Sequence, residues 1–102
     1  MNIHLIEKNR HIRLIQKELW RFESGDWIVS VDKATRLHGG MIYFHETQAG
    51  PSHFGGRIID HRVLPKDDPN AGKIVFIFDR LDEAIDVRTS PEGWAVSQKT
   101  VE

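Results

Sequence analysis

The segment 45–56 carries the residues best suited to recognise a ligand. Its three glycines allow backbone amide groups to approach a ligand closely, and Ser52 and His53 offer polar groups that can read the edge of a nucleobase. Phe54 adds an aromatic face, and stacking on such a face contributes about 1–3 kcal/mol per base. Because loops on a rigid scaffold often carry function, we expect Ser52, His53 and Phe54 to form the wall of a pocket.

Four more side chains have the flat, partly apolar rings that the floor of such a pocket needs: Trp27, Tyr43, His45 and Trp94. In a small domain the hydrophobic core is the favoured place for Trp27 and Tyr43, with the pocket floor as the alternative. Phe54 could likewise pack over one end of the barrel instead of lining a pocket.

A series of basic residues precedes this region. Arg10, Arg13, Lys17 and Arg21 follow steps of three, four and four, which place them on one face of a helix. A ridge of this kind can follow a phosphate backbone, and we expect Arg10, Arg13 and Lys17 to contact phosphates. The alternative is a solvated helix face, because three glutamates between positions 7 and 23 weaken the local positive field.

Histidines and carboxylates raise two further hypotheses. His38, His45, His53 and His61, with Glu46, are ligand types of mononuclear metal sites, and His45 and His61 would meet if they lay on neighbouring strands with the same facing. No His-x-His or His-Glu-x-x-His spacing is present, so we assign no metal and no cofactor.

Catalysis has little support from local motifs. The chain has no cysteine, and no Gly-x-Ser-x-Gly elbow frames any serine. A small hydrolase could use His45, Glu46 and Lys99, but acid–base chemistry requires these groups to be close together. We therefore predict no catalytic residue and retain the hydrolase as the second hypothesis.

The composition is that of one globular domain spanning residues 1–102. The chain is 39% hydrophobic and 28% charged, with a formal net charge of −1. A protein that binds long duplex DNA through many phosphates is usually far more basic. The absence of cysteine, of a membrane-length apolar run and of a signal-peptide pattern at the N-terminus leads us to expect a cytoplasmic protein without a membrane partner.

The periodicity of the apolar residues predicts the elements that position these side chains. Ile12, Ile15, Leu19 and Phe22 follow helical spacing and predict one main helix over residues 10–23. Strands are predicted over 3–6, 27–31, 41–45, 57–63 and 73–78, the last of them central and buried on both faces. Residues 48–56 and 66–72 are predicted to be loops. This order indicates an α+β fold whose mostly antiparallel sheet curls or closes into a small β-barrel.

Two short stretches resemble PUA-like domains. Ser24-Gly25-Asp26-Trp27-Ile28-Val29 resembles their Gly-Asp element before an apolar strand. Ile42-Tyr43-Phe44-His45, followed by a loop and Gly55-Gly56-Arg57-Ile58-Ile59, resembles the EVE and YTH branches. The resemblance covers residues 25–63, although the Trp-Asp-Gly-Val-Arg-Asn stretch and the Ser-Glu-Pro opening of EVE domains are absent. It implies a PUA-like β-barrel, and ASCH-type relatives are associated with lysine-with-carboxylate chemistry.

The EVE and YTH branches hold a single, often modified, base in an aromatic pocket. The resemblance therefore implies a nucleic-acid-binding module whose partner is RNA or DNA, as a single strand or a flipped-out base. The low net charge indicates modest binding, or binding assisted by a protein partner. The alternatives are a small hydrolase acting on RNA or a modified nucleoside, and a metal-dependent, cupin-like barrel.

Overall fold

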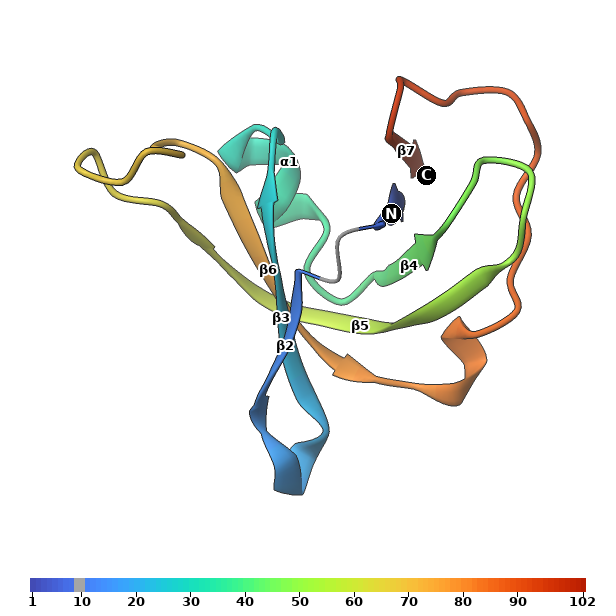
Figure 1. Cartoon of the computed structure of the whole chain (residues 1–102), viewed down its shortest axis with the longest axis horizontal. Helices are drawn as coiled ribbons and strands as arrows, with labels where there is room; N and C mark the ends of the chain where they lie inside the picture. Colours follow the sequence, from blue (N-terminus) through green and yellow to red (C-terminus); the bar gives the residue numbers. More distant parts are fainter. Residues whose placement is uncertain (9–10) are drawn as a thin grey trace.

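The computed structural model describes residues 1–8 and 11–102, and these form a mostly-β domain (Figure 1). Seven strands in the described residues make one sheet with the order β2-β3-β6-β5-β4-β1-β7. They are β1 (Asn2–Ile6), β2 (Ile12–Gln16), β3 (Arg21–Trp27), β4 (Met41–His45), β5 (Ser52–Val63), β6 (Ile74–Arg80) and β7 (Gln98–Val101). The described residues also contain one short α-helix, α1 (Val31–Arg36), and two 3-10 turns, η1 (Lys17–Leu19) and η2 (Asp82–Ala84).

The sheet is mixed and open. β1 and β4 are parallel, and the other neighbouring strands are antiparallel. β2 and β7 form its two edges, and within the described residues they do not pair with each other. The expectation of a β-rich domain is therefore confirmed, whereas the sheet does not close into a barrel. The chain termini lie near each other, because β7 pairs with β1 (Figure 1).

The predicted helix over residues 10–23 is wrong. Residues 12–16 and 21–27 form the β2–β3 hairpin, which extends beyond the rest of the sheet (Figure 1), and Arg10 lies outside the described residues. Helical spacing arose by coincidence, because Ile12 and Phe22 lie on the two strands of the hairpin and both pack against the core. Phe22 stacks on Phe78 of β6, and this tertiary packing outweighs local helix propensity.

The helix that does form lies further along the chain. The Ser30 hydroxyl accepts a hydrogen bond from the Lys33 amide at 3.1 Å and caps α1 at its N-terminus. Ala34 and the following Leu37 are fully buried, so the helix covers part of the core. The strand predicted over 27–31 is not found: Trp27 is the last residue of β3, and Ser30 and Val31 begin the helix.

The core confirms the predicted central strand. β6 lies between β3 and β5, and Ile74, Phe76 and Phe78 are fully buried. The predicted strand at 41–45 coincides with β4, and the predicted turn at 66–72 lies between β5 and β6. The remaining fully buried apolar side chains of the core come from β1, α1 and its C-terminal end, β4 and β5: Ile3, Leu5, Ala34, Leu37, Ile42, Phe44 and Ile58.

The predicted loop at 48–56 ends at Pro51, five residues before Gly56, because β5 begins at Ser52. Gly55 and Gly56 lie within this strand, where backbones of the neighbouring strands come very close. A Cβ atom on Gly56 would lie 1.9 Å from the Asp79 carbonyl oxygen of β6, and one on Gly55 would lie 2.1 Å from the Ile42 carbonyl oxygen of β4. The glycines are therefore needed for the packing of three strands.

No helix in the described part of the chain has both the length and the apolar character needed to cross a membrane.

The Gly56→Ala variant tests this packing. We expect the free energy of unfolding to fall by about 3 kcal/mol, because the Asp79 backbone has to move away from the new methyl group. Gly72→Ala is the control: its site is open but has φ +84°, and the expected loss is about 1 kcal/mol. Chemical denaturation measures both values, and a Gly56→Ala protein as stable as Gly72→Ala would contradict the argument.

Candidate functional site

A cleft of about 730 Å³ is lined by residues that follow β1 and β4 and by residues of β2 and β5. Its size is within the range of small-molecule sites. Seven described residues line it: Glu7, Lys8, Ile12, Glu46, Thr47, His53 and Phe54. His53 and Phe54, both predicted for the pocket wall, thus border one cavity.

Phe54 is the aromatic wall of this cleft. Its half-buried ring packs edge-on against Phe22, with centroids 5.0 Å apart, and against Phe78, with centroids 6.0 Å apart. The Arg80 guanidinium lies 5.8 Å from the ring centroid. Because these side chains hold the Phe54 ring in place, the ring would lose little conformational entropy if a ligand bound in the cleft.

The remaining lining residues are mostly polar. Lys8, Glu46, Thr47 and His53 are exposed, whereas Glu7 is buried. The Thr47 hydroxyl accepts a hydrogen bond from the Gly50 amide at 3.0 Å, which fixes the loop after β4. An apolar wall with a polar rim can bind a flat heterocycle and read its edge.

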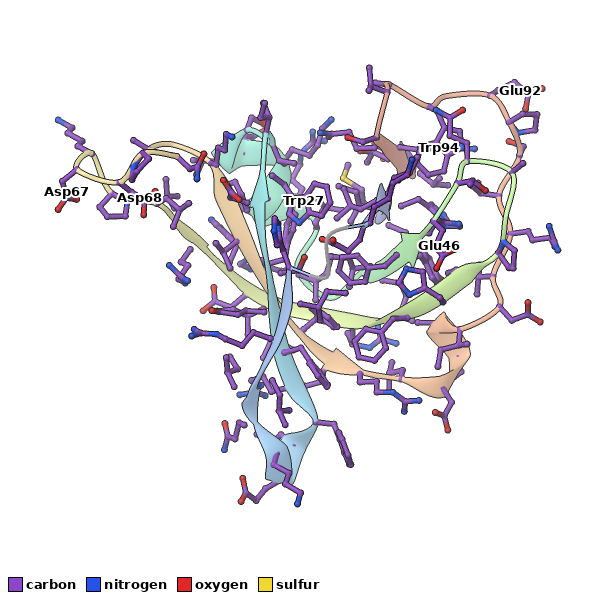
Figure 2. All side chains as sticks on the ribbon, viewed as in Figure 1. Trp27, Glu46, Asp67, Asp68, Glu92 and Trp94 are labelled. Carbon is purple, nitrogen blue, oxygen red and sulfur yellow. The ribbon has the colours of Figure 1, made fainter. Side chains whose placement is uncertain are left out.

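A second cleft of about 420 Å³ adjoins the first, since both are lined by Glu7 and Lys8. Trp27 is in its wall, and the Trp27 indole donates a hydrogen bond to the Ser24 hydroxyl at 3.1 Å. Figure 2 shows Trp27 beside β3 and Trp94 beside the C-terminal segment, so the two tryptophans do not share a site.

Ser52 stabilises the fold and does not border a described cleft. Its side chain is buried, its hydroxyl donates to the Ala84 carbonyl at 2.6 Å, and the same oxygen accepts from the Val87 amide at 2.9 Å. Ser52 therefore anchors the segment after β6 to the start of β5, and it is not among the residues that line the described clefts.

Tyr43, His45 and Trp94 do come together, but around a histidine that the sequence analysis missed. The His4 ring stacks on Tyr43, with centroids 4.6 Å apart and planes at 23°. The Trp94 ring lies edge-on to His4 and His45 at centroid distances of 6.3 and 5.6 Å. His4 thus occupies one face of the Tyr43 ring. Its position between the apolar residues Ile3 and Leu5 was the available signal.

Hydrogen bonding defines the protonation of this imidazole pair. His45 Nδ1 lies 2.9 Å from the Gly50 carbonyl oxygen, which can only accept, so Nδ1 carries the proton. In the neutral pair, His45 Nε2 therefore accepts from His4 Nδ1 at 2.8 Å. Burial lowers the pKa of His4 to about 4, and repulsion from the protonated form of His45 and from the Lys99 ammonium adds to this shift. Burial likewise lowers the pKa of His45.

The predicted phosphate contacts do not form a helical ridge. Arg13 is on β2 and pairs with Glu23 of β3, and it faces away from the cleft because neighbouring Ile12 faces into it. Lys17 is in the η1 turn of the hairpin. Arg21 forms an ion pair with Asp79 at 2.8 Å.

The residues of the two alternative hypotheses are brought together only in part. Glu46 borders the cleft, whereas His45 is fully buried and the Lys99 ammonium donates to the Ser90 carbonyl at 2.8 Å. His45 pairs with Ser52, which precedes His61 by nine residues, or about 30 Å of β5, so His45 and His61 do not meet. His38 and His61, by contrast, lie side by side, with His38 Nε2 2.8 Å from His61 Nδ1.

No protein-family model, curated protein or solved structure matches this chain. The case for a site thus rests on its geometry. The imidazole cluster is filled by its own rings, while the cleft beside Phe54 is open and combines an aromatic wall with exposed polar groups.

The buried imidazole pair predicts a pH-dependent stability. Since the pKa of His4 is about 4 in the fold and 6.5 as the ordinary value, the unfolded chain binds more protons between these pH values. Stability is therefore full above pH 6.5 and falls as the pH drops towards 4, with up to about 3 kcal/mol from His4. The side-chain amide of His4→Gln can still donate to His45, but it does not titrate. Denaturation curves of this variant should therefore show a smaller loss of stability between pH 6.5 and pH 4 than those of the native protein.

The control is His53→Gln, which removes an exposed imidazole and should keep the native pH dependence. A native pH dependence in His4→Gln would contradict the assignment.

Proposed function

We propose that this chain is a binding module that holds a single nucleobase of single-stranded RNA or DNA in the cleft beside Phe54. The observation that carries the proposal is the Phe54 ring, which borders a cleft of about 730 Å³ together with the exposed His53 and Glu46 side chains.

The aromatic wall supports a base as the ligand. An unstacked base exposes two flat faces, and aromatic side chains are the usual partners of such faces in proteins. The packing of Phe54 against Phe22 and Phe78 fixes the ring before a ligand arrives, so binding costs little conformational entropy at this residue. Ile12 adds apolar surface to the same cleft.

The polar rim supports recognition of the base edge. The Glu46 carboxylate can accept hydrogen bonds from exocyclic amino or ring N–H groups, and the Thr47 hydroxyl and the His53 ring can donate or accept. Lys8 is the one lysine or arginine among the described residues that line the cleft, and Glu7 and Glu46 line it too. Affinity should therefore come mainly from the base, with few phosphate contacts and a shallow dependence on salt.

The resemblance of residues 25–63 to the EVE and YTH branches points to the same ligand class. We include in this proposal that the domain is PUA-like. Its sheet would then be an open form of the PUA-like barrel, with β2 and β7 as its edges. A preference for a modified base would be the form of recognition that the resemblance implies.

The proposal predicts how variants of the cleft bind labelled oligomers. Single-stranded RNA and DNA hexamers, with and without modified bases, are titrated with protein and followed by fluorescence anisotropy. Phe54→Leu should raise the Kd about 5- to 100-fold, because the stacking face is lost while much of the apolar volume remains. His53→Ala and Glu46→Gln should each raise it about tenfold, the effect of one lost polar contact.

The matched control is His61→Ala, which removes a histidine eight residues further along β5 and should bind as the native protein does. Circular dichroism confirms that each variant is folded. Absence of binding by the native protein at 50 mM salt would contradict the proposal, as would a native Kd in both His53→Ala and Phe54→Leu.

A further inference from the structure

A second group of side chains with metal-binding atoms lies where the end of α1 meets β5. His38 Nε2 and His61 Nδ1 are 2.8 Å apart, and His38 Nε2 is 3.9 Å from Asp60 Oδ1. These three donor atoms all lie within 4.8 Å of one another. We propose that His38, Asp60 and His61 form a Zn²⁺ site with one coordination position open to water.

The backbone positions His38 beside β5. The Gly39 amide donates to the Ile58 carbonyl at 2.8 Å, and the Ile58 amide donates to the Gly40 carbonyl at 2.8 Å. These two hydrogen bonds join the segment that follows α1 to the strand that carries the other two ligands. The site is therefore assembled by the fold, because His38 lies more than 20 residues before Asp60 and His61 in sequence.

A local hydrogen bond brings the Asp60 carboxylate towards His61. Neighbouring residues of a regular strand point to opposite faces of the sheet, and Asp60 and His61 pair regularly with Ile77 and Phe76 of β6. The Asp60 carboxylate nevertheless accepts a hydrogen bond from the His61 amide at 2.8 Å, which turns one of its oxygens back along the strand. That oxygen therefore lies within 4.8 Å of the ring nitrogens of His38 and His61.

The donor set suits zinc. Two imidazoles and a carboxylate are common zinc ligands, with bonds of about 2.0–2.2 Å. Tetrahedral geometry at these lengths separates ligand atoms by about 3.3 Å. The two imidazole nitrogens, now 2.8 Å apart, therefore open by about 0.5 Å, and the Asp60 oxygen, now 3.9 Å from His38 Nε2, closes on it by about 0.6 Å. His38 and Asp60 are exposed, which leaves their side chains free to make these adjustments.

Charge and protons also balance. Without metal, the N–H group of one imidazole donates a hydrogen bond to the facing nitrogen of the other. When zinc binds, the donor ring changes tautomer and carries its proton on the other ring nitrogen. Both facing nitrogens then have a lone pair for the ion. The Asp60 carboxylate offsets one of the two positive charges. The nearby cations have partners: Arg57 donates to the Gly39 carbonyl, and Arg62 lies 3.4 Å from Glu23.

Calorimetry of the full chain without an affinity tag tests the proposal, with Zn²⁺ as the titrant. We expect one saturable Zn²⁺ per chain. His38→Ala and His61→Ala should each weaken it by at least about 100-fold, since each removes a direct ligand, and Asp60→Asn by about tenfold or more. Co²⁺ in place of Zn²⁺ should give the ligand-field absorption of a four-coordinate site, which is lost in His38→Ala.

His53→Ala is the matched control, because it removes an exposed histidine at the other end of β5 and should keep the native zinc affinity. Zn²⁺ should also raise the melting temperature of the native protein but not of His38→Ala, because the ion connects α1 to β5. Equal Zn²⁺ affinity in the native, His38→Ala and His61→Ala proteins would overturn the proposal, as would absence of binding by the native protein. Base binding is measured separately, so the two proposals can fail independently.

Discussion

The packing of Phe22, Phe54 and Phe78 against one another is the interaction on which the fold and the cleft both depend. The three rings come from β3, β5 and β6, with centroids 5.0–6.0 Å apart. This contact draws the β2–β3 hairpin onto the central strands. It also leaves the Phe54 ring fixed at the border of the cleft of about 730 Å³. The same aromatic surface that stabilises the core thus becomes the wall of the proposed binding site.

β5 positions most of the chemistry of this protein. Its first residues supply Ser52, His53 and Phe54, and its later residues supply Asp60 and His61. Departures from regular pairing occur on both sides of the strand, opposite the end of β4 and after Ile58. Gly55 and Gly56 allow close neighbours on both sides. A long strand with these irregularities can present side chains to one cleft at its start and to a second cluster near its end.

The sequence predicted the strands whose stability follows from local pattern. β4 and the central β6 were found because β-branched and aromatic residues dominate both. The region 10–23 failed because apolar spacing fits a helix as well as two paired strands, and the choice depends on contacts with Phe78 that are distant in sequence. α1 could have been suggested by Ser30 as an N-cap, with Ala34 and Leu37 one turn apart.

For the candidate site, the sequence identified His53 and Phe54 but not the residues around them. Glu7, Lys8 and Ile12 join the cleft only through the order of strands in the sheet. Residue type also could not show that His4 fills the space beside Tyr43, or that the Ser52 hydroxyl is already bonded on both sides. These facts depend on strand register, which a single sequence does not specify.

The most direct test of the account is a ¹H–¹⁵N NMR titration of the native protein with single nucleoside monophosphates. The account predicts saturable shifts at Lys8, Glu46, Thr47, His53 and Phe54, with little change at the Trp94 indole, which belongs to the filled imidazole cluster. Shifts centred on Tyr43 and Trp94, or no saturable shifts at the cleft, would contradict it.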